Sequence, residues 1–395
     1  MDYFKESLKL HKKNQGKIEV TSKIDVQTTE DLSLVYSPGV AEPCIKISQN
    51  QEAVWDYTLK SSTVAIVSDG SAVLGLGNIG ARAAIPVMEG KAMLFKKFAD
   101  INGFPICLDT QDTEEIIRTV RLIAPVFGGI NLEDINAPKC FEIENRLQDL
   151  GIPVFHDDQH GTAIVVIAGL INACKVVKKK LEDLTVVVNG AGAAGVAIAK
   201  MLKCIGFSED ECTPVKELIM CDSTGIIHRD RKDLNKSKLE LLTFSNSANR
   251  SGSVKDAIVG ADVFIGVSVA NLLTARDIKK MNKDAIIFAL ANPVPEIMPE
   301  EAYKGGAAVV GTGRSDLPNQ VNNVLGFPGV FRGALDAKAK VISPSMKLAA
   351  AYAIAKCVKN PSRECVIPPC LDLNVAKEVA KAVKKAALKD VDTYW

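Results

Sequence analysis

The sequence lacks a net charge that would draw it to a polyanion. Its 395 residues contain 48 lysines and arginines against 47 aspartates and glutamates, which leaves a net charge of +1. A chain so balanced has no overall field that attracts nucleic acid or an anionic membrane surface. We therefore expect no nucleic-acid partner and no membrane partner.

Long apolar runs are also missing. The most apolar stretches, 164–174 and 186–202, are shorter than the roughly 20 residues of a membrane span, and Asn189 and three glycines interrupt the second. The polar, lysine-rich residues 1–15 contain no apolar core of the length that a signal peptide needs. We expect a cytoplasmic protein with no transmembrane segment.

Paired cysteine motifs are absent as well. None of the ten cysteines forms a C-x-x-C pair, and most lie inside apolar runs. This pattern favours reduced, buried thiols over disulfides or a zinc site.

The features that are present indicate an α/β protein of two domains. The length fits two domains, and 47% apolar with 24% charged residues is a globular composition. Short β-branched runs alternate with longer helical patterns, which is typical of βαβ units around a parallel sheet. We expect strands at 63–67, 105–108, 125–128, 153–155, 184–188, 217–221, 263–265, 285–289 and 307–310. We expect helices at 81–98, 113–123, 138–150, 162–177 and 374–389, with the domains divided into 1–158 and 159–395.

One glycine motif predicts a dinucleotide site. The run 186–195 passes from a strand through Gly190-Ala191-Gly192-Ala193-Ala194-Gly195 and Val196 into a helix. These glycines allow a tight turn, backbone approach to a pyrophosphate and close packing of helix on strand. Asp222, at the end of the next strand, is placed to bind the adenosine ribose. An acid there favours NAD over NADP, although Arg229, Arg231 and Lys232 lie close by in the sequence.

A second motif of the same form, 75–80, is separated from its strand by residues 68–74. It therefore lacks the immediate strand-to-helix joint of a dinucleotide site. We interpret it as a loop on the substrate side, with ordinary turn glycines as the alternative.

Four carboxylates follow two neighbouring strands. Glu133 and Asp134 come after the strand at 125–128, and Asp157 and Asp158 come after the strand at 153–155. Parallel strands end at the same sheet edge, so these oxygens should converge and would repel one another without a cation. Oxygen ligands without cysteine predict Mg²⁺ or Mn²⁺, and helix capping is the alternative for any single acid.

Other candidate side chains are more ambiguous. Lys91 lies on an apolar helical turn, where it could act as a general base with a lowered pKa or pair with one of the four acids, and a surface lysine is an equal alternative. Tyr36 precedes a Pro-Gly turn and by itself reads as a packed tyrosine. His156 and His160 flank a strand end, which favours capping or hydrogen bonding over metal binding.

Seven motifs in order together resemble the short-subunit malic enzymes, from about residue 16 to the C-terminus. They are 36–43 (YSPGVAEP), 75–80 (GLGNIG), 89–91 (EGK), 131–135 (NLEDI), 156–162 (HDDQHGT), 190–195 (GAGAAG) and 291–293 (ANP).

The resemblance implies an amino-acid-dehydrogenase-like N-terminal domain followed by a Rossmann-type domain. It also implies oxidative decarboxylation of L-malate to pyruvate and CO₂ with NAD or NADP and Mg²⁺ or Mn²⁺, in a homodimer whose N-terminal segment lies near the partner's site. By motif, Glu133, Asp134 and Asp158 are the metal ligands, Lys91 is the general base, Asp157 is its ion-pair partner and Tyr36 is the general acid. Asn292 and the pair Asn322 and Asn323 resemble the amides that orient malate and the nicotinamide ribose.

The sequence departs from larger malic enzymes at Ser71-Ala72-Val73, where they carry an arginine that grips malate. Three other functions stay open. They are a malolactic decarboxylase that retains its cofactor, a metal-free amino-acid dehydrogenase, and a non-catalytic nucleotide sensor.

Overall fold

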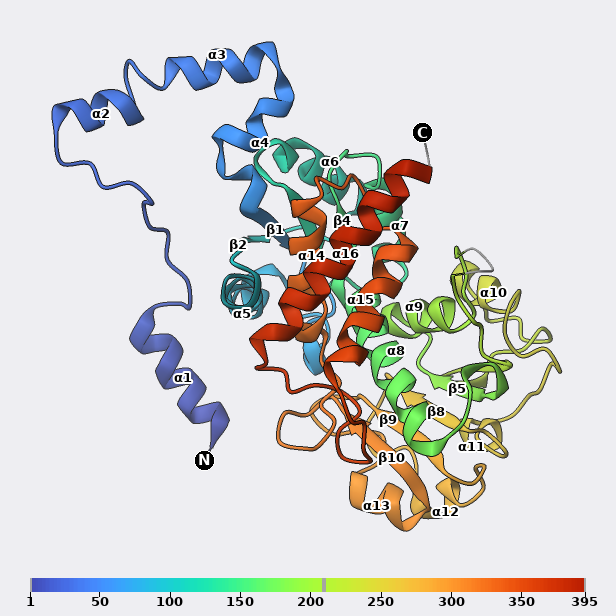
Figure 1. Cartoon of the computed structure of the whole chain (residues 1–395). Helices are drawn as coiled ribbons and strands as arrows, with labels where there is room; N and C mark the ends of the chain where they lie inside the picture. Colours follow the sequence, from blue (N-terminus) through green and yellow to red (C-terminus); the bar gives the residue numbers. More distant parts are fainter. Residues whose placement is uncertain (1, 208–210, 394–395) are drawn as a thin grey trace.

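The computed structural model describes residues 2–207 and 211–393, which form two sheets with helices around them (Figure 1). The first sheet has the order β2-β1-β3-β4, and the second has the order β10-β9-β8-β5-β6-β7. Every pair of neighbouring strands is parallel except β6 with β7. The expected α/β class is confirmed. The strands are β1 (Thr63–Ser68), β2 (Asn102–Cys107), β3 (Gly129–Leu132), β4 (Val154–His156), β5 (Thr185–Asn189), β6 (Glu217–Asp222), β7 (Gly225–Ile226), β8 (Val263–Gly266), β9 (Ala285–Ala289) and β10 (Ala307–Thr312).

Helices cover both sheets, and this explains why a strand such as β1 is buried along its whole length. The helices are α1 (Tyr3–Asn14), α2 (Thr29–Val35), α3 (Ala41–Gln49), α4 (Val54–Tyr57), α5 (Ala81–Ala99), α6 (Thr113–Ile123), α7 (Lys139–Arg146), α8 (Asp157–Val177), α9 (Ala193–Leu202), α10 (Lys236–Leu241), α11 (Val254–Ala257), α12 (Ala275–Ile278), α13 (Pro299–Lys304), α14 (Phe327–Asp336), α15 (Pro344–Cys357) and α16 (Leu373–Thr393).

The strand expected at 125–128 is wrong by four residues. Ala124–Val126 form a 3₁₀ turn instead, and Pro125 has no N–H to give to a strand ladder. The strand β3 follows at Gly129–Leu132, so Glu133 is the first residue beyond it. Helix α8 begins at Asp157, five residues before the predicted start, and therefore carries both aspartates in its first turn.

The C-terminal helices return to the first sheet. Phe327 and Phe331 of α14 pack edge-on against Phe95 of α5, with ring centroids 4.8 and 5.4 Å away. Helix α16, predicted as an amphipathic tail, packs in turn on α14, where Val379 and Val383 are fully buried. The tail therefore supports the domain that contains the first sheet.

Glycines allow the close approach of α14 to α16. A Cβ added at Gly333 would lie 2.5 Å from the carbonyl oxygen of Ala380 and 2.7 Å from the Cβ of Val383. We predict that Gly333→Ala lowers the free energy of unfolding by about 1–3 kcal/mol, because the helices must separate. Gly90→Ala is the control, since that mid-helix position has only the Lys17 amine within 4 Å. Calorimetric unfolding that shows equal midpoints for both variants would contradict the prediction.

Helix α8 has the length and composition of a membrane span but lies in the protein core. It has 21 residues, and its most apolar window has a mean hydropathy of 1.7. Two thirds of that window is buried inside the protein, against both sheets and against α9 and α15. Its apolar character is therefore accounted for by packing.

The N-terminal arm, residues 2–50, stands apart from the body in Figure 1. None of the residues in α1, α2 or α3 is buried, and apolar side chains such as Phe4, Val20 and Leu34 are largely exposed. The arm touches α5 at Lys17, whose backbone N–H donates to Glu89 and whose amine donates to the carbonyl of Pro86. It therefore presents apolar surface that its own body does not cover.

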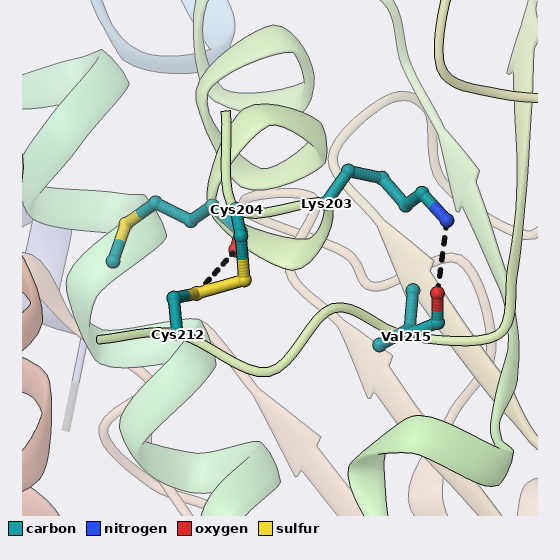
Figure 2. The surroundings of a disulfide bond; sticks show 5 residues. Lys203, Cys204, Cys212 and Val215 are labelled. Atoms are coloured by element: carbon teal, nitrogen blue, oxygen red, sulfur yellow. Dashed lines mark hydrogen bonds between the residues drawn. A yellow bond between two sulfur atoms is a disulfide. The ribbon is translucent and has the colours of Figure 1, made fainter. Parts of the chain in front are cut away.

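A disulfide joins Cys204 to Cys212, which the expectation of reduced thiols did not foresee (Figure 2). Cys204 follows the C-terminal end of α9, and Cys212 lies in the segment that returns toward β6, so their Cα atoms lie 5.7 Å apart. Nearby, the Lys203 amine donates to the carbonyl of Val215. The other eight cysteines, all in the described part of the chain, are free thiols as expected, but only Cys140, Cys174 and Cys221 are buried, and Cys44 and Cys365 are exposed.

Candidate active site

The predicted gathering of carboxylates at one sheet edge is confirmed. β3 and β4 pair in parallel, with Leu132 opposite His156 as the last residue of each strand. Glu133 and Asp157 are the next residues along each chain segment, so they leave the sheet side by side. Both are buried, together with Asp134.

Three of the acids form a set that fits a metal ion. Oxygens of Glu133, Asp134 and Asp158 all lie within 4.8 Å of one another. The Asp134 backbone N–H donates to Asp158 Oδ2 at 2.8 Å, which holds the two segments together. Burial raises the pKa of Glu133 and of Asp158, and a cation is what would keep such carboxylates ionised. An all-oxygen set of this kind suits Mg²⁺ or Mn²⁺.

Asp157 is not part of this metal set, and its partner is Lys91. Its Oδ2 lies 2.6 Å from Lys91 Nζ, and the same amine lies 2.8 Å from Glu133 Oε1. Lys91 extends from α5 and is 7% exposed, and its ammonium lies 4.2 Å from the centroid of the Phe327 ring. The structure thus joins Lys91 both to the ion-pair partner that the resemblance implied and to one oxygen of the metal set.

The expected lowering of the Lys91 pKa is wrong for this arrangement of charges. Burial alone lowers the pKa, but the carboxylates of Asp157 and Glu133 outweigh it and raise the pKa above its ordinary value. The sequence showed the apolar helical neighbours of Lys91 but could not show that two acids from other strands face it.

The two adjacent asparagines separate into two roles. Asn323 Nδ2 donates to Asp157 Oδ2 at 2.6 Å, so this amide belongs to the cluster. Asn322 instead accepts the backbone N–H of Val324 and caps a short 3₁₀ turn, Asn323–Leu325.

Asn292 lies where the two domains meet. A Cβ added at Gly75 would lie 2.6 Å from the Asn292 carbonyl oxygen, so the 75–80 loop of the first domain reaches the loop after β9. The same loop is tied to the β2–α6 connection by Asn78 and Gln111, whose side-chain amides exchange hydrogen bonds of 3.1 and 2.8 Å. This placement agrees with a loop on the substrate side.

The nucleotide motif has the three local features that its glycines predicted. Gly190 adopts a φ of 118°, which permits the turn after β5. A Cβ at Gly195 would lie 1.7 Å from the Gly190 carbonyl oxygen, so only glycine lets α9 pack there. Gly192 has nothing within 4 Å of such a Cβ, which leaves open space at the start of α9 where Ala193, Ala194 and Val196 follow.

Asp222 ends β6 as expected, but it is already engaged by two cations. Arg231 contacts both of its oxygens at 2.8 and 2.9 Å, and Lys238 contacts Oδ2 at 2.6 Å. Burial alone would raise the pKa of Asp222, yet these partners lower it to about 2. Of the three basic residues noted in the sequence, Arg231 is the one that reaches the carboxylate. Lys238 was missed because it lies on α10, 16 residues further along.

Tyr36 is not brought to the cluster within this chain. It follows α2 in the arm, its side chain is 68% exposed, and α2 lies far from β3 and β4 in Figure 1. Within this chain, the structure therefore does not place Tyr36 beside Lys91 or the carboxylates.

The expected capping or hydrogen-bonding role is confirmed for His160 but is not seen for His156. The Nε2 of His160 lies 2.8 Å from Glu144 Oε1 and 3.0 Å from Oε2. The His156 side chain makes no capping hydrogen bond, and neither of its ring nitrogens has a hydrogen-bond partner among the described residues. Burial lowers the pKa of both rings. Glu144 itself was missed from the sequence. Its one indication in the sequence is that Glu144 occupies a position of the predicted helix 138–150 that should face the core, where an apolar residue is expected.

Two domain families match this chain over most of its length. The family described as malic enzyme, N-terminal domain, matches residues 13–148. The family described as malic enzyme, NAD binding domain, matches residues 159–388.

Several known proteins are similar to this chain over almost its entire length. The bifunctional malic/malolactic enzyme of Bacillus subtilis is 57% identical over 98% of this chain and 94% of its own length. The NAD-dependent malic enzyme of Geobacillus stearothermophilus is 55% identical over 95% of this chain and 77% of its own length. The crystal structure of an NAD-dependent malic enzyme from Thermotoga maritima superposes with a TM-score of 0.91 at 49% identity, covering 96% of this chain and 98% of that chain.

Proposed function

This chain belongs to the malic enzyme family, and from that premise we propose that it oxidises and decarboxylates L-malate to pyruvate and CO₂ while reducing NAD or NADP. The observation that carries the proposal is the contact of Lys91 with both Asp157 and Glu133, next to the three-carboxylate set. A base beside a metal site is the pairing that this chemistry needs.

The proposed reaction gives each of these side chains a role. When bound, the dinucleotide would accept a hydride, and a divalent cation held by the three carboxylates would polarise malate's oxygens and offset the Glu133 charge that raises the Lys91 pKa. Lys91 in its neutral form takes the proton of the C2 hydroxyl, and Asp157, which itself accepts a hydrogen bond from Asn323, holds the amine in place. Tyr36 returns a proton to C3 after CO₂ leaves. Glu133, Asp134 and Asp158 hold the cation, and Asn292 and Asn323 orient the substrate and the nicotinamide ribose.

Removal of the metal tests this function directly. We predict that excess chelator lowers the rate of malate-dependent cofactor reduction at least about 100-fold, and that Mn²⁺ or Mg²⁺ restores it, because the cation stabilises developing negative charge. Initial rates followed by absorbance of the reduced cofactor measure the effect. Activity that survives the chelator would instead indicate a metal-free dehydrogenase.

We propose NAD as the preferred cofactor. The Asp222 carboxylate at the end of β6 and the NAD-dependent relatives at 49% and 55% identity support this preference. Arg231 and Lys238 offset the charge of Asp222, so we predict a modest preference, with kcat/KM about tenfold higher for NAD than for NADP. Saturation curves for each cofactor at fixed malate and Mn²⁺ measure the ratio, and an equal or inverted ratio would contradict the preference.

A second candidate function has the support of one relative. The Bacillus subtilis protein at 57% identity is described as both a malic and a malolactic enzyme. A malolactic reaction would consume malate and release lactate without net cofactor reduction, with the same residues. Parallel assays of malate, lactate, pyruvate and reduced cofactor distinguish the two reactions.

We further propose that the working unit is a cytoplasmic homodimer, with the chain divided at residue 158 into a malate- and metal-binding domain and a cofactor-binding domain. The exposed apolar side chains of the arm, among them Val20 and Leu34, support a partner that covers them. The exposed Tyr36 supports a site completed by the partner's arm. Eight free thiols support a cytoplasmic location, whereas the disulfide between Cys204 and Cys212 is uncommon in that compartment.

A further inference from the structure

Glu144 has no role in the proposed reaction, yet it is hydrogen-bonded to the first turn of α8, which carries Asp157 and Asp158. It is on α7, it is 8% exposed, and its carboxylate faces the first turn of α8. Its Oε1 accepts the His156 backbone N–H at 3.1 Å, and its Oε2 accepts the Gln159 side-chain amide at 3.0 Å. The His160 ring donates to the same carboxylate through Nε2.

The spacing of these donors matters for the geometry of the helix. Residues three and four apart lie on one face of a helical turn, so His156, Gln159 and His160 face α7 together. Asp157 and Asp158 lie between them in the sequence and therefore project from other sides of the turn, Asp157 toward Lys91 and Asp158 toward Asp134. One carboxylate thus fixes how far this turn is rotated about its own axis.

The first turn of α8 has no cap of its own. His156 is the N-cap residue, and its side chain makes no capping hydrogen bond. The carboxylate of Glu144 accepts the backbone N–H of this N-cap residue from a neighbouring helix, and it places negative charge at the helix N-terminus, where charge of that sign is stabilised.

We propose that Glu144 is a positioning residue for the metal site, which holds the first turn of α8 in the orientation that lets Asp158 join Glu133 and Asp134. This inference rests on the proposed function, because it assumes that the three-carboxylate set binds a divalent cation. Glu144 touches neither substrate nor metal, and it acts through Gln159, His160 and the His156 backbone. Partners that orient metal ligands from outside typically contribute 10–100-fold in metal affinity.

The test compares Mn²⁺ binding by the full-length protein and two variants of the same helix, without malate or cofactor. Glu144→Gln keeps the shape of the side chain but turns one oxygen into a donor that faces other donors. Glu142→Gln is the matched control, because Glu142 is exposed and pairs only with Arg146 at 3.1 Å among the contacts described. The signal of free Mn²⁺ in electron paramagnetic resonance gives Kd for each protein.

We expect the control to bind Mn²⁺ within twofold of the unmodified protein and Glu144→Gln to bind it 10–100-fold more weakly. We also expect NADH affinity, measured by fluorescence, to change by less than twofold, since the dinucleotide motif is on another element. A Kd for Glu144→Gln within twofold of the unmodified protein would overturn the inference. Absence of Mn²⁺ binding to the unmodified protein would overturn the proposed metal site, and the inference with it.

A second variant guards against a folding defect. Gln159→Leu removes one donor and leaves the carboxylate bonded to His160 and to the backbone. We expect it to fold and to bind Mn²⁺ about 3–10-fold more weakly. Unchanged Mn²⁺ affinity together with a lowered thermal midpoint would mean that the contacts only stabilise the fold, and this outcome also counts against the inference.

Discussion

Replacing Lys91 by alanine is expected to lower kcat for malate oxidation about 1,000-fold, the middle of the range for loss of a general base. The reason lies in its contacts, because Lys91 is the cation held between Asp157 at 2.6 Å and Glu133 at 2.8 Å. Steady-state rates at saturating malate, NAD and Mn²⁺ measure the loss. The affinity for NADH, measured by fluorescence, should stay within about threefold, since the dinucleotide motif belongs to the second sheet.

The control for this variant is Lys97→Ala, which removes an exposed lysine from the same helix. We expect it to keep full activity. The Lys91 variant leaves two buried carboxylates without their ammonium, which is costly to stability, so its thermal midpoint must be compared with the assay temperature. A folded Lys91→Ala protein that turns over malate at the normal rate would refute the base assignment and favour a non-catalytic, nucleotide-sensing role.

Tyr36→Phe is expected to lower kcat about 100-fold, because the phenol is proposed to return the proton to C3. A more informative experiment mixes the Tyr36→Phe protein with the Lys91→Ala protein and measures the activity of the mixture. If Tyr36 serves the partner's site, a dimer of one Tyr36→Phe chain and one Lys91→Ala chain contains one site with both groups intact. We therefore expect the two inactive proteins, unfolded and refolded together, to regain about a quarter of the normal activity per chain.

The alternative arrangement gives a different result. If each chain uses its own Tyr36, every site in the mixed dimer lacks one group, and activity stays at the level of the separate variants. Regained activity would also show that the chains exchange and dimerise. Absence of recovery in a mixture that contains mixed dimers by mass spectrometry would contradict the shared site.

The sequence predicted the parts of the site that depend on one strand and the residues after it. The glycine motif at 190–195 and the acids after β3 and β4 fall in this class, because parallel strands force their ends to one edge. The location of β3 itself was wrong, since Pro125 and the 3₁₀ turn lie inside an apolar run that reads like a strand. The error was harmless because Glu133 still follows a strand end.

Contacts between distant elements were beyond sequence reasoning. The resemblance implied the pairing of Lys91 with Asp157, 66 residues away, but nothing in the sequence indicated that Glu133 also contacts the amine, and the sign of the Lys91 pKa shift was therefore predicted wrongly. The choice between Asn322 and Asn323 also depends on tertiary placement. The same holds for Cys204 and Cys212, whose spacing carries no known signature but whose elements return to one place.

Helix α8 links the carboxylate cluster to the second sheet. It begins with Asp157 and Asp158 at the carboxylate cluster, and the rest of it, to Val177, lies in the region that matches the NAD binding domain. At 1.5 Å per residue, its 21 residues make a rod about 32 Å long. If α8 tilted by about 5° about its first turn, its C-terminal end would move by roughly 3 Å. By the same geometry, a change in the tilt of α8 against the second sheet would move the turn that carries Asp157 and Asp158.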